Sequence, residues 1–435
     1  MHQRLVSFLV VVSAIVLATP ALAVEFQPIG FESASMGGAG VASAKGSYAP
    51  YYNPALLAEH KHGAQISLSV GAGIREVNVA NHIDCLADIE IDETMDQIAN
   101  NAPDSGTNTE SDRNNIATIK NELRALSEKN GLQIMPSAAL GIQVGNFGFG
   151  AYGVSEATAY AVIDDSRLDI IVENDGYYYE YDESDDTYSD STFDEYKQRS
   201  LEYALDEGLT YLKLTGLAYL EIPISYGHQF TTEWGNLYCG GSFKIMPGYT
   251  FDDKIKVDTE SGDVDSELED AEKRDTSWGI DLGLLYKPSR LPNLSLGLVG
   301  KNLNTPKFDT ATGNTLKVKP QVRAGFAYDF WDDRLTIAID ADLTNNETFI
   351  PDYDSQFIGG GINYHPFNWL SLRGGAMKNL QESYVGTVYT AGLGCGLKWF
   401  QLDIAGQISS KKGEYEGDEI PRYARIQVAL VSKWF

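Results

Sequence analysis

The chain has 435 residues and a formal net charge of −28 at pH 7, with 42 glycines and 25 tyrosines. A chain this acidic repels phosphate groups, so we exclude nucleic acid as a partner. The three cysteines, Cys85, Cys239 and Cys395, form neither a CxxC pair nor a disulfide framework, and we predict no metal and no cofactor.

The first 23 residues have the layout of a secretory signal peptide. Arg4 precedes an apolar stretch over residues 5–17, and Ala21-Leu22-Ala23 forms a small-residue cleavage site. A permanent membrane anchor is the alternative, but the apolar stretch is short for a helix that spans a bilayer. We therefore expect residues 1–23 to be removed on export, with Val24 as the first residue of the mature protein.

A glycine-rich segment precedes the first predicted strand. Residues 30–58 read GFESASMGGAGVASAKGSYAPYYNPALLA. Glycine permits tight backbone bends, and Asn-Pro is a turn starter whose side chain bonds its own backbone. The segment is too polar to span lipid, so we predict that residues 24–63 fold back into the lumen of a barrel as a plug, or hatch. The residues predicted to form its gate are Gly37, Gly38, Gly40, Asn53, Pro54 and Ala55.

The rest of the chain, residues 64–435, reads as one large all-β unit. Its mean hydropathy is only −0.23, but a barrel hides its membrane signal because only every second residue meets lipid. The predicted strands cover residues 64–77, 133–144, 147–163, 211–230, 236–250, 277–286, 293–302, 321–330, 333–344, 356–364, 368–377, 388–397, 402–409 and 423–435. This even count of about fourteen predicts an antiparallel transmembrane barrel with both ends on the periplasmic side.

The connections between these strands alternate strictly between short and long. The short ones are residues 145–146, 231–235, 287–292, 331–332, 365–367 and 398–401, and the long ones are 78–132, 164–210, 251–276, 303–320, 345–355, 378–387 and 410–422. A soluble β-sandwich has no reason to keep every second connection short. The pattern is typical of outer-membrane barrels, so we expect a Gram-negative outer-membrane location with membrane lipid as a partner.

Strand alternation assigns side chains to the two faces of the wall. In residues 335–343 the apolar side chains share one face and the carboxylates of Asp340 and Asp342 share the other, which cannot meet lipid. The same reasoning places Lys244, Arg323 and Arg373 in the lumen, where they could hold a carboxylate head group. The plainer alternative is that they simply fill a polar barrel interior.

Turn lengths predict the strand registers. A two-residue Gly145-Asn146 turn pairs Val144 with Phe147, both apolar. A two-residue turn at residues 331–332 sets Arg323 opposite Asp340, a predicted ion pair in the lumen.

Some long loops have structure of their own. Residues 89–100, 115–130 and 193–207 read as short polar helices. Residues 164–207 are crowded with carboxylates and tyrosines, but no EF-hand spacing is present, so we favour a solvated acidic surface over a calcium site.

The chain ends in an aromatic residue, Phe435, which is the usual signal of such barrels to the barrel assembly machinery. The residues in phase with it are Lys433, Val431, Ala429 and Gln427, whereas Trp434, Leu430, Val428 and Ile426 form the apolar face. This register departs from the usual pattern, in which the terminal aromatic continues the apolar face.

The amino-terminal segment resembles that of the FadL family of long-chain fatty acid transporters. The matching positions are Ser35, Gly37, Ala39, Gly40 and Ala42, followed by Asn53, Pro54 and Ala55. The resemblance implies a fourteen-stranded outer-membrane barrel with an amino-terminal hatch, whose members pass hydrophobic compounds sideways towards the membrane. The same run, together with LAYLEIPISYG at residues 217–227, also resembles the TraF-like outer-membrane proteins of conjugal transfer. The long loops match neither group, which leaves the substrate open.

We do not expect an enzyme. The six histidines lie in the signal peptide, near turns or in loops, without a GxSxG elbow or a metal-spaced cluster. The leading hypothesis is a monomeric barrel that passes a small hydrophobic ligand under the control of the hatch. The alternative is a structural or scaffold subunit of an envelope machine such as conjugal transfer or secretion.

Overall fold

The computed structural model describes residues 24–59, 64–87, 89, 91–103, 108–255, 271–396, 400–415 and 417–434. The predicted signal peptide, the last four residues of the predicted hatch and Phe435 lie outside these residues. No helix in the described part of the chain is long and apolar enough to cross a membrane.

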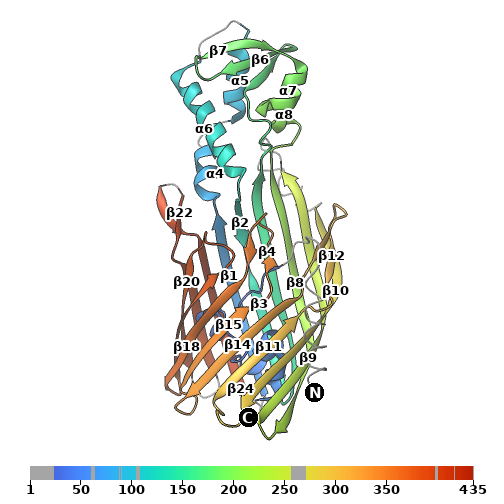
Figure 1. Cartoon of the computed structure of the whole chain (residues 1–435), viewed down its shortest axis with the longest axis vertical. Coiled ribbons are helices and arrows are strands. Elements are labelled where there is room, and N and C mark those ends of the chain that lie inside the picture. The colour runs from blue at the N-terminus through green and yellow to red at the C-terminus, as the bar shows by residue number, and fades with distance from the viewer. Residues whose placement is uncertain are drawn as a thin grey trace.

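The main sheet is a closed antiparallel barrel (Figure 1). Its strands are β1 (Ala64–Val77), β2 (Gly131–Ile134), β3 (Ser137–Val144), β4 (Phe147–Val162), β8 (Tyr211–Thr232), β9 (Gly235–Ile255), β10 (Glu272–Pro288), β11 (Leu294–Lys301), β14 (Gln321–Phe330), β15 (Leu335–Asp342), β18 (Phe357–Phe367), β19 (Leu370–Asn379), β20 (Thr387–Gly396), β21 (Phe400–Ser409) and β24 (Tyr423–Trp434). β2 and β3 occupy one position, because Ile74 pairs with Ile134 and Gly71 with Ser137 in a single register. The barrel therefore has the fourteen strand positions that the sequence predicts, and β1 closes it by pairing with β24.

One of the two predicted registers is confirmed and the other is wrong. Val144 pairs with Phe147 across the turn at 145–146, as predicted. Across the next predicted turn, however, Arg323 pairs with Asp342, and Asp340 lies opposite Gly325. The connection is four residues long, 331–334, and its first three residues have positive φ angles of 53° to 64°. Because of this left-handed stretch, β15 begins two residues later than predicted, at Leu335. The predicted two-residue turn is therefore wrong.

The outer surface is apolar all round the barrel. On β24, Ile426, Val428 and Leu430 point outward with 37–58% of their surface exposed, while Gln427 and Ala429 are buried. Large exposed hydrophobic side chains recur at alternate positions on the other strands, for example Leu68, Ile224, Leu282, Ile339 and Leu393. The lipid-facing phase predicted for β24 is confirmed, and an apolar belt on a closed sheet defines a transmembrane barrel.

Two long connections form a distal domain that rises above one side of the barrel in Figure 1. Its elements are α4 (Ala80–Ala87), α5 (Ile91–Asn101), α6 (Glu110–Leu126), β5 (Ile171–Asn174), β6 (Tyr177–Asp182), β7 (Thr187–Ser191), α7 (Phe193–Arg199) and α8 (Leu201–Asp206). The predicted helices are present, but α4 and the three-stranded sheet were not predicted. Residues 78–130 and 163–210 carry 27 Asp and Glu against 7 Lys and Arg, so most of the net charge is here.

The distal domain has its own hydrophobic core. Ile98, Ile116, Ile119 and Leu201 are completely buried in it. The Arg113 guanidinium bonds the Asp186 carboxylate at 2.7 Å and ties the two connections together. The domain is therefore a packed unit rather than two loose loops.

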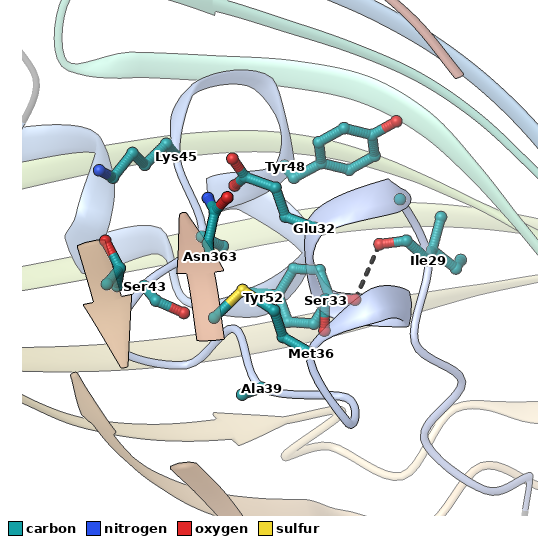
Figure 2. A pocket seen from close by; sticks show the side chains of 13 residues that line it. Ile29, Glu32, Ser33, Met36, Ala39, Ser43, Lys45, Tyr48, Tyr52 and Asn363 are labelled. Atoms are coloured by element: carbon teal, nitrogen blue, oxygen red, sulfur yellow. Dashed lines mark hydrogen bonds between the residues drawn. The ribbon is translucent and has the colours of Figure 1, made fainter. Parts of the chain in front are cut away.

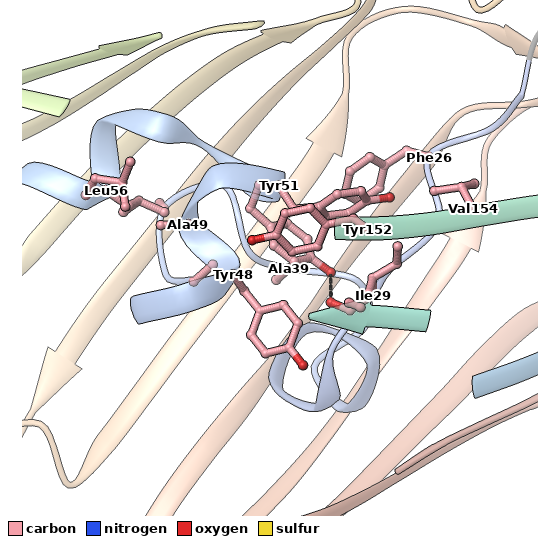
Figure 3. Packing of buried hydrophobic residues seen from close by; sticks show 14 of the residues in the cluster. Phe26, Ile29, Ala39, Tyr48, Ala49, Tyr51, Leu56, Tyr152 and Val154 are labelled. Atoms are coloured by element: carbon pink, nitrogen blue, oxygen red, sulfur yellow. Dashed lines mark hydrogen bonds between the residues drawn. The ribbon is translucent and has the colours of Figure 1, made fainter. Parts of the chain in front are cut away.

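Residues 24–59, which we call the inner segment, lie inside the barrel. The segment contains α2 (Phe31–Ser35), η2 (Gly46–Tyr48), α3 (Ala49–Tyr52) and η3 (Pro54–Ala58). From Val24 to Ala58 every residue is buried except Glu32, Ser43 and Lys45. Figure 3 shows its aromatic and aliphatic side chains packed against Tyr152 and Val154 of β4.

Candidate functional site

The inner segment is bonded to the wall through backbone groups of the predicted gate. The N–H groups of Gly40 and Val41 donate to one oxygen of the Asp340 carboxylate on β15, at 2.7 and 2.8 Å. The Asn53 side-chain amide donates to the carbonyls of Val41 and Leu284 at 2.9 and 3.0 Å. These bonds join Gly40 and Asn53 of the predicted gate to each other through Val41, and to two strands of the wall, β15 and β10, that are separated by β14 and β11.

The Asn53-Pro54-Ala55 element is a capped turn. The Asn53 side chain accepts the Ala55 N–H at 3.0 Å and begins η3, with Pro54 at the first position. A proline there costs no backbone bond, because the first N–H groups of a helix have no intrahelical partner. The Asn-Pro-Ala sequence thus places the Asn53 side-chain amide where it caps η3 and also bonds the Leu284 carbonyl of the barrel wall.

Glycines in the inner segment and glycines in the barrel wall allow the two to approach each other closely. Gly37 has a φ of +64°, and a Cβ placed on it would lie 2.3 Å from the Ala376 carbonyl oxygen. On the wall, a Cβ on Gly359 would lie 2.0 Å from the Gly37 carbonyl oxygen, and one on Gly240 would lie 2.3 Å from the Ala55 nitrogen. Gly38 also has a positive φ, but its nearest foreign atom is 3.8 Å away.

The predicted lumen residues all point inward, and each cation already has a carboxylate partner. Lys244 lies 3.0 Å from both Glu221 and Asp281, and Arg373 lies 2.6 Å from Asp403. Arg323 lies 2.6 Å from Asp342 and 4.0 Å from Asp340. A ligand carboxylate would have to displace a wall carboxylate to bind them, so a head-group site remains a prediction.

Aromatic residues that the sequence analysis missed hold the beginning of the inner segment. The Phe26 ring lies 3.9 Å from the Arg323 guanidinium and 5.2 Å from the Lys301 ammonium. Lys301 also lies 3.5 Å from the Tyr51 ring, which packs 5.4 Å from Phe26. Cations are attracted to aromatic faces more strongly when both groups are buried away from solvent, as Phe26, Lys301 and Arg323 are. No local pattern signals this cluster, because its members come from positions far apart in the chain.

The backbone hydrogen bonding between β4 and the strand position of β2 and β3 is interrupted at Pro136. We call this interruption the seam, and the inner segment bridges it. Pro136, between β2 and β3, has no N–H to donate to Ser155 on β4, its partner in the register. The Gln27 side-chain amide donates to the Ser155 carbonyl instead, at 2.9 Å. On the other side, Met135 and Gly73 exchange two backbone bonds of 2.8 and 3.1 Å, so the strand stays joined to β1.

External loops cover the lumen from the other end. They contribute β12 (Lys307–Asp309), β13 (Thr315–Lys317), β16 (Asn346–Glu347) and β17 (Asp354–Ser355), while β22 (Lys412–Tyr415) and β23 (Asp418–Pro421) form a further hairpin. Phe308 is fully buried and stacks on Tyr219 with ring centroids 5.9 Å apart. Phe308 and Phe349 belong to the same apolar cluster as Phe26 and Leu57 of the inner segment. The barrel interior is therefore packed from the long loops at one end to the short turns at the other.

A small cavity remains between the inner segment and the wall (Figure 2). Its volume is about 20 Å³, enough for one water-sized molecule. Glu32, Ser33 and Lys45 line it from the segment, and Thr336 and Asn363 line it from β15 and β18 near their periplasmic ends. The described residues include no group of three or more His, Cys, Asp or Glu that could hold a metal ion.

These features define a closed membrane β-barrel whose lumen is occupied by its own amino-terminal segment. Residues 50–342, about two thirds of the chain, match the family described as "F plasmid transfer operon, TraF, protein", and the chain belongs to this family. None of the curated protein sequences matches it significantly.

Solved structures with a similar fold are FadL-type barrels. A deltaS2 mutant of the TodX monoaromatic hydrocarbon channel superposes with a TM-score of 0.50 at 14% identity, covering 94% of this chain and 99% of that one. The Ralstonia pickettii toluene transporter TbuX gives 0.48 at 14% identity, with 94% and 98% covered. A Pseudomonas aeruginosa FadL homologue gives 0.45 at 11% identity, with 96% and 99% covered. The FadL-like fold predicted from the amino-terminal motif is confirmed.

Proposed function

We propose that this protein is a passive outer-membrane channel for small hydrophobic compounds, with the inner segment as its hatch. The observation that carries the proposal is the apolar cluster that runs from Phe308 and Phe349 of the external loops to Phe26 and Leu57 of the inner segment. A barrel interior that serves only water-soluble solutes is polar. Movement of the loops and the inner segment would open an apolar route instead.

The similar channels support this proposal by their stated activities. TodX is named a monoaromatic hydrocarbon channel, and TbuX a toluene transporter. We take small aromatic hydrocarbons as the first ligands to test, with fatty acids as the second. The working protein would be a monomer, exported by cleavage after Ala23 and inserted by the barrel assembly machinery through Phe435.

Uptake measurements test the proposal directly. Cells that express the protein should take up labelled toluene faster than a deletion strain, while the uptake of labelled glucose should be the same in both. Equal toluene and fatty acid uptake in the two strains would contradict a transport role. Faster uptake of glucose as well would indicate a general leak rather than a hydrophobic channel.

A second candidate function is that of a scaffold in an envelope machine, which the family description also suggests. The feature that favours it is the distal domain, whose packed core and net charge of −20 are unnecessary for a hydrophobic channel. Co-purification from crosslinked cells, with and without residues 163–210, tests this role. A partner that is captured only by the full chain supports a scaffold, and identical captures contradict it.

A further inference from the structure

The buried charges of the lumen do not balance. In the described residues, six buried cations face seven buried carboxylates there, and two further carboxylates at the external rim, Glu76 and Asp252, pair with Arg422 and Lys213. The cations are Arg75, Lys244, Lys301, Arg323, Arg373 and Arg425, and the carboxylates are Glu25, Glu156, Glu221, Asp281, Asp340, Asp342 and Asp403. The described part of the interior therefore has one more buried carboxylate than buried cations.

Among the described residues, Glu156 on β4 is the lumen carboxylate that has no Lys or Arg nitrogen within ion-pair distance. It is completely buried, and its oxygens accept only from neutral donors: the Glu25 N–H at 3.1 Å, the Gln27 amide at 3.4 Å and the Gln133 amide at 3.3 Å. Each of the other six has a Lys or Arg nitrogen within 4.0 Å. Arg425 donates to the Ser137 hydroxyl at 3.0 Å and to the side-chain oxygen of Gln27 at 3.2 Å, so Gln27 stands between it and Glu156. A buried carboxylate without an ionic partner is costly in its charged form, so it must either take up a proton or be paired with a cation.

The beginning of the mature chain lies next to Glu156. Val24 is 1% exposed, and its carbonyl accepts from the Gln321 side chain at 2.6 Å. Successive backbone nitrogens are at most about 3.7 Å apart, which follows from the bond lengths between them. Because the Glu25 nitrogen bonds Glu156 at 3.1 Å, the Val24 nitrogen lies within about 7 Å of the carboxylate.

We propose that removal of the leader supplies such a cation. Signal peptidase hydrolyses the Ala23–Val24 peptide bond: water gives its hydroxyl to the Ala23 carbonyl and a proton to the Val24 nitrogen. A second proton from solvent makes that nitrogen an α-ammonium at neutral pH. The new ammonium pairs with Glu156 inside the lumen and holds the inner segment in place. The inference rests on the proposed leader and does not depend on what the barrel transports.

The wild-type protein provides the first test. Mass spectrometry of protein purified from outer membranes should find a terminal peptide that begins at Val24. An amine-reactive reagent near pH 7 should label this α-amine at least tenfold more slowly in the folded barrel than in urea. A different first residue, or equal labelling rates, would overturn the proposal without bearing on hydrocarbon uptake.

A double-mutant cycle separates charge pairing from burial. Mature chains are acetylated in urea at mildly acidic pH, where the α-amine reacts before lysine because its pKa is lower, and are then refolded in detergent micelles. In planar bilayers, acetylation and Glu156→Gln should each raise the leak conductance severalfold, and the two together should raise it no further than either alone. Multiplying effects would refute the pairing. Glu221→Gln is the matched control, because Glu221 pairs with Lys244 and Lys301 and its effect should multiply with that of acetylation.

Discussion

The Gly40 N–H donates to the Asp340 carboxylate at 2.7 Å, across 300 residues of sequence, and so ties the inner segment to the barrel wall. The Val41 N–H reaches the same oxygen at 2.8 Å. Hydrogen bonds to a charged group contribute about 1.5–3 kcal/mol each, so Asp340→Ala should weaken the seating of the segment by about 3 kcal/mol or more. Proteolysis of residues 24–59 in detergent-solubilised barrel measures this. Asp340→Asn keeps an acceptor oxygen and should be cut more slowly than the alanine variant, and equal rates for all three proteins would contradict the tether.

Deletion of residues 31–54 should convert the barrel into an open pore. These residues make up most of the inner segment, whose buried side chains fill the lumen. Single-channel recordings in planar bilayers should show a stable conductance at least tenfold above that of the wild type. As a control, replacing the exposed residues 182–185 of the distal domain with glycine and serine should leave the conductance unchanged. An equally closed deletion variant would show that the external loops alone seal the barrel.

The sequence predicts the wall well because its signal is local. Alternation with a period of two depends only on neighbouring residues, so the fourteen positions and the lipid-facing phase of β24 could be predicted from the sequence. The partner of Arg323 could not, because it depends on whether residues 331–333 adopt a left-handed conformation. Tyr177–Asp182, a strand in the distal sheet, reads YYYEYD, and its mixture of rings and carboxylates conceals the alternation.

The candidate site was predicted only in part, for a related reason. The gate residues stand in one short motif, and the lumen charges follow from strand phase. The fold of the inner segment determines which gate residue contacts which wall residue. This fold has no periodic pattern in the sequence from which it could be predicted. Phe26, Lys301 and Glu156 are therefore found only in three dimensions.

Two neighbouring glycines should respond differently to alanine. Both Gly37 and Gly38 have positive φ, which costs an alanine about 1–2 kcal/mol. At Gly37 the new Cβ would also lie 2.3 Å from the Ala376 carbonyl oxygen, whereas at Gly38 it has room. Thermal unfolding followed by the heat-modifiable mobility of the barrel should give a clearly lower Tm for Gly37→Ala than for Gly38→Ala. Equal Tm values would mean that the segment does not approach β19 closely.

The distal domain should become more stable as the pH falls from 7 to 4.5. Burial raises the pKa of Glu202 to about 7 in the folded domain, against 4.5 in the unfolded chain. A raised pKa favours the folded state below the lower value, and this stability is lost as pH rises through the higher one. Allowing for partial solvent screening, the change is about 2 kcal/mol. Hydrogen exchange of residues 171–206 should slow accordingly. Glu202→Gln keeps the acceptor for the Glu173 N–H and should exchange slowly at both pH values, and an unchanged pH dependence in this variant would contradict the assignment.

The seam at Pro136 allows a test by rescue. Gln27→Ala leaves the Ser155 carbonyl without its donor, and an unsatisfied buried group costs about 1–3 kcal/mol. Pro136→Ala restores a backbone N–H in the register that faces Ser155, so it should matter little alone but should recover most of the loss in the double variant. Urea unfolding of the barrel in detergent gives the four free energies of unfolding for this cycle. If the two changes are additive, then Gln27 does not act at the seam, and its bonds to Glu156 and Arg425 must account for any loss.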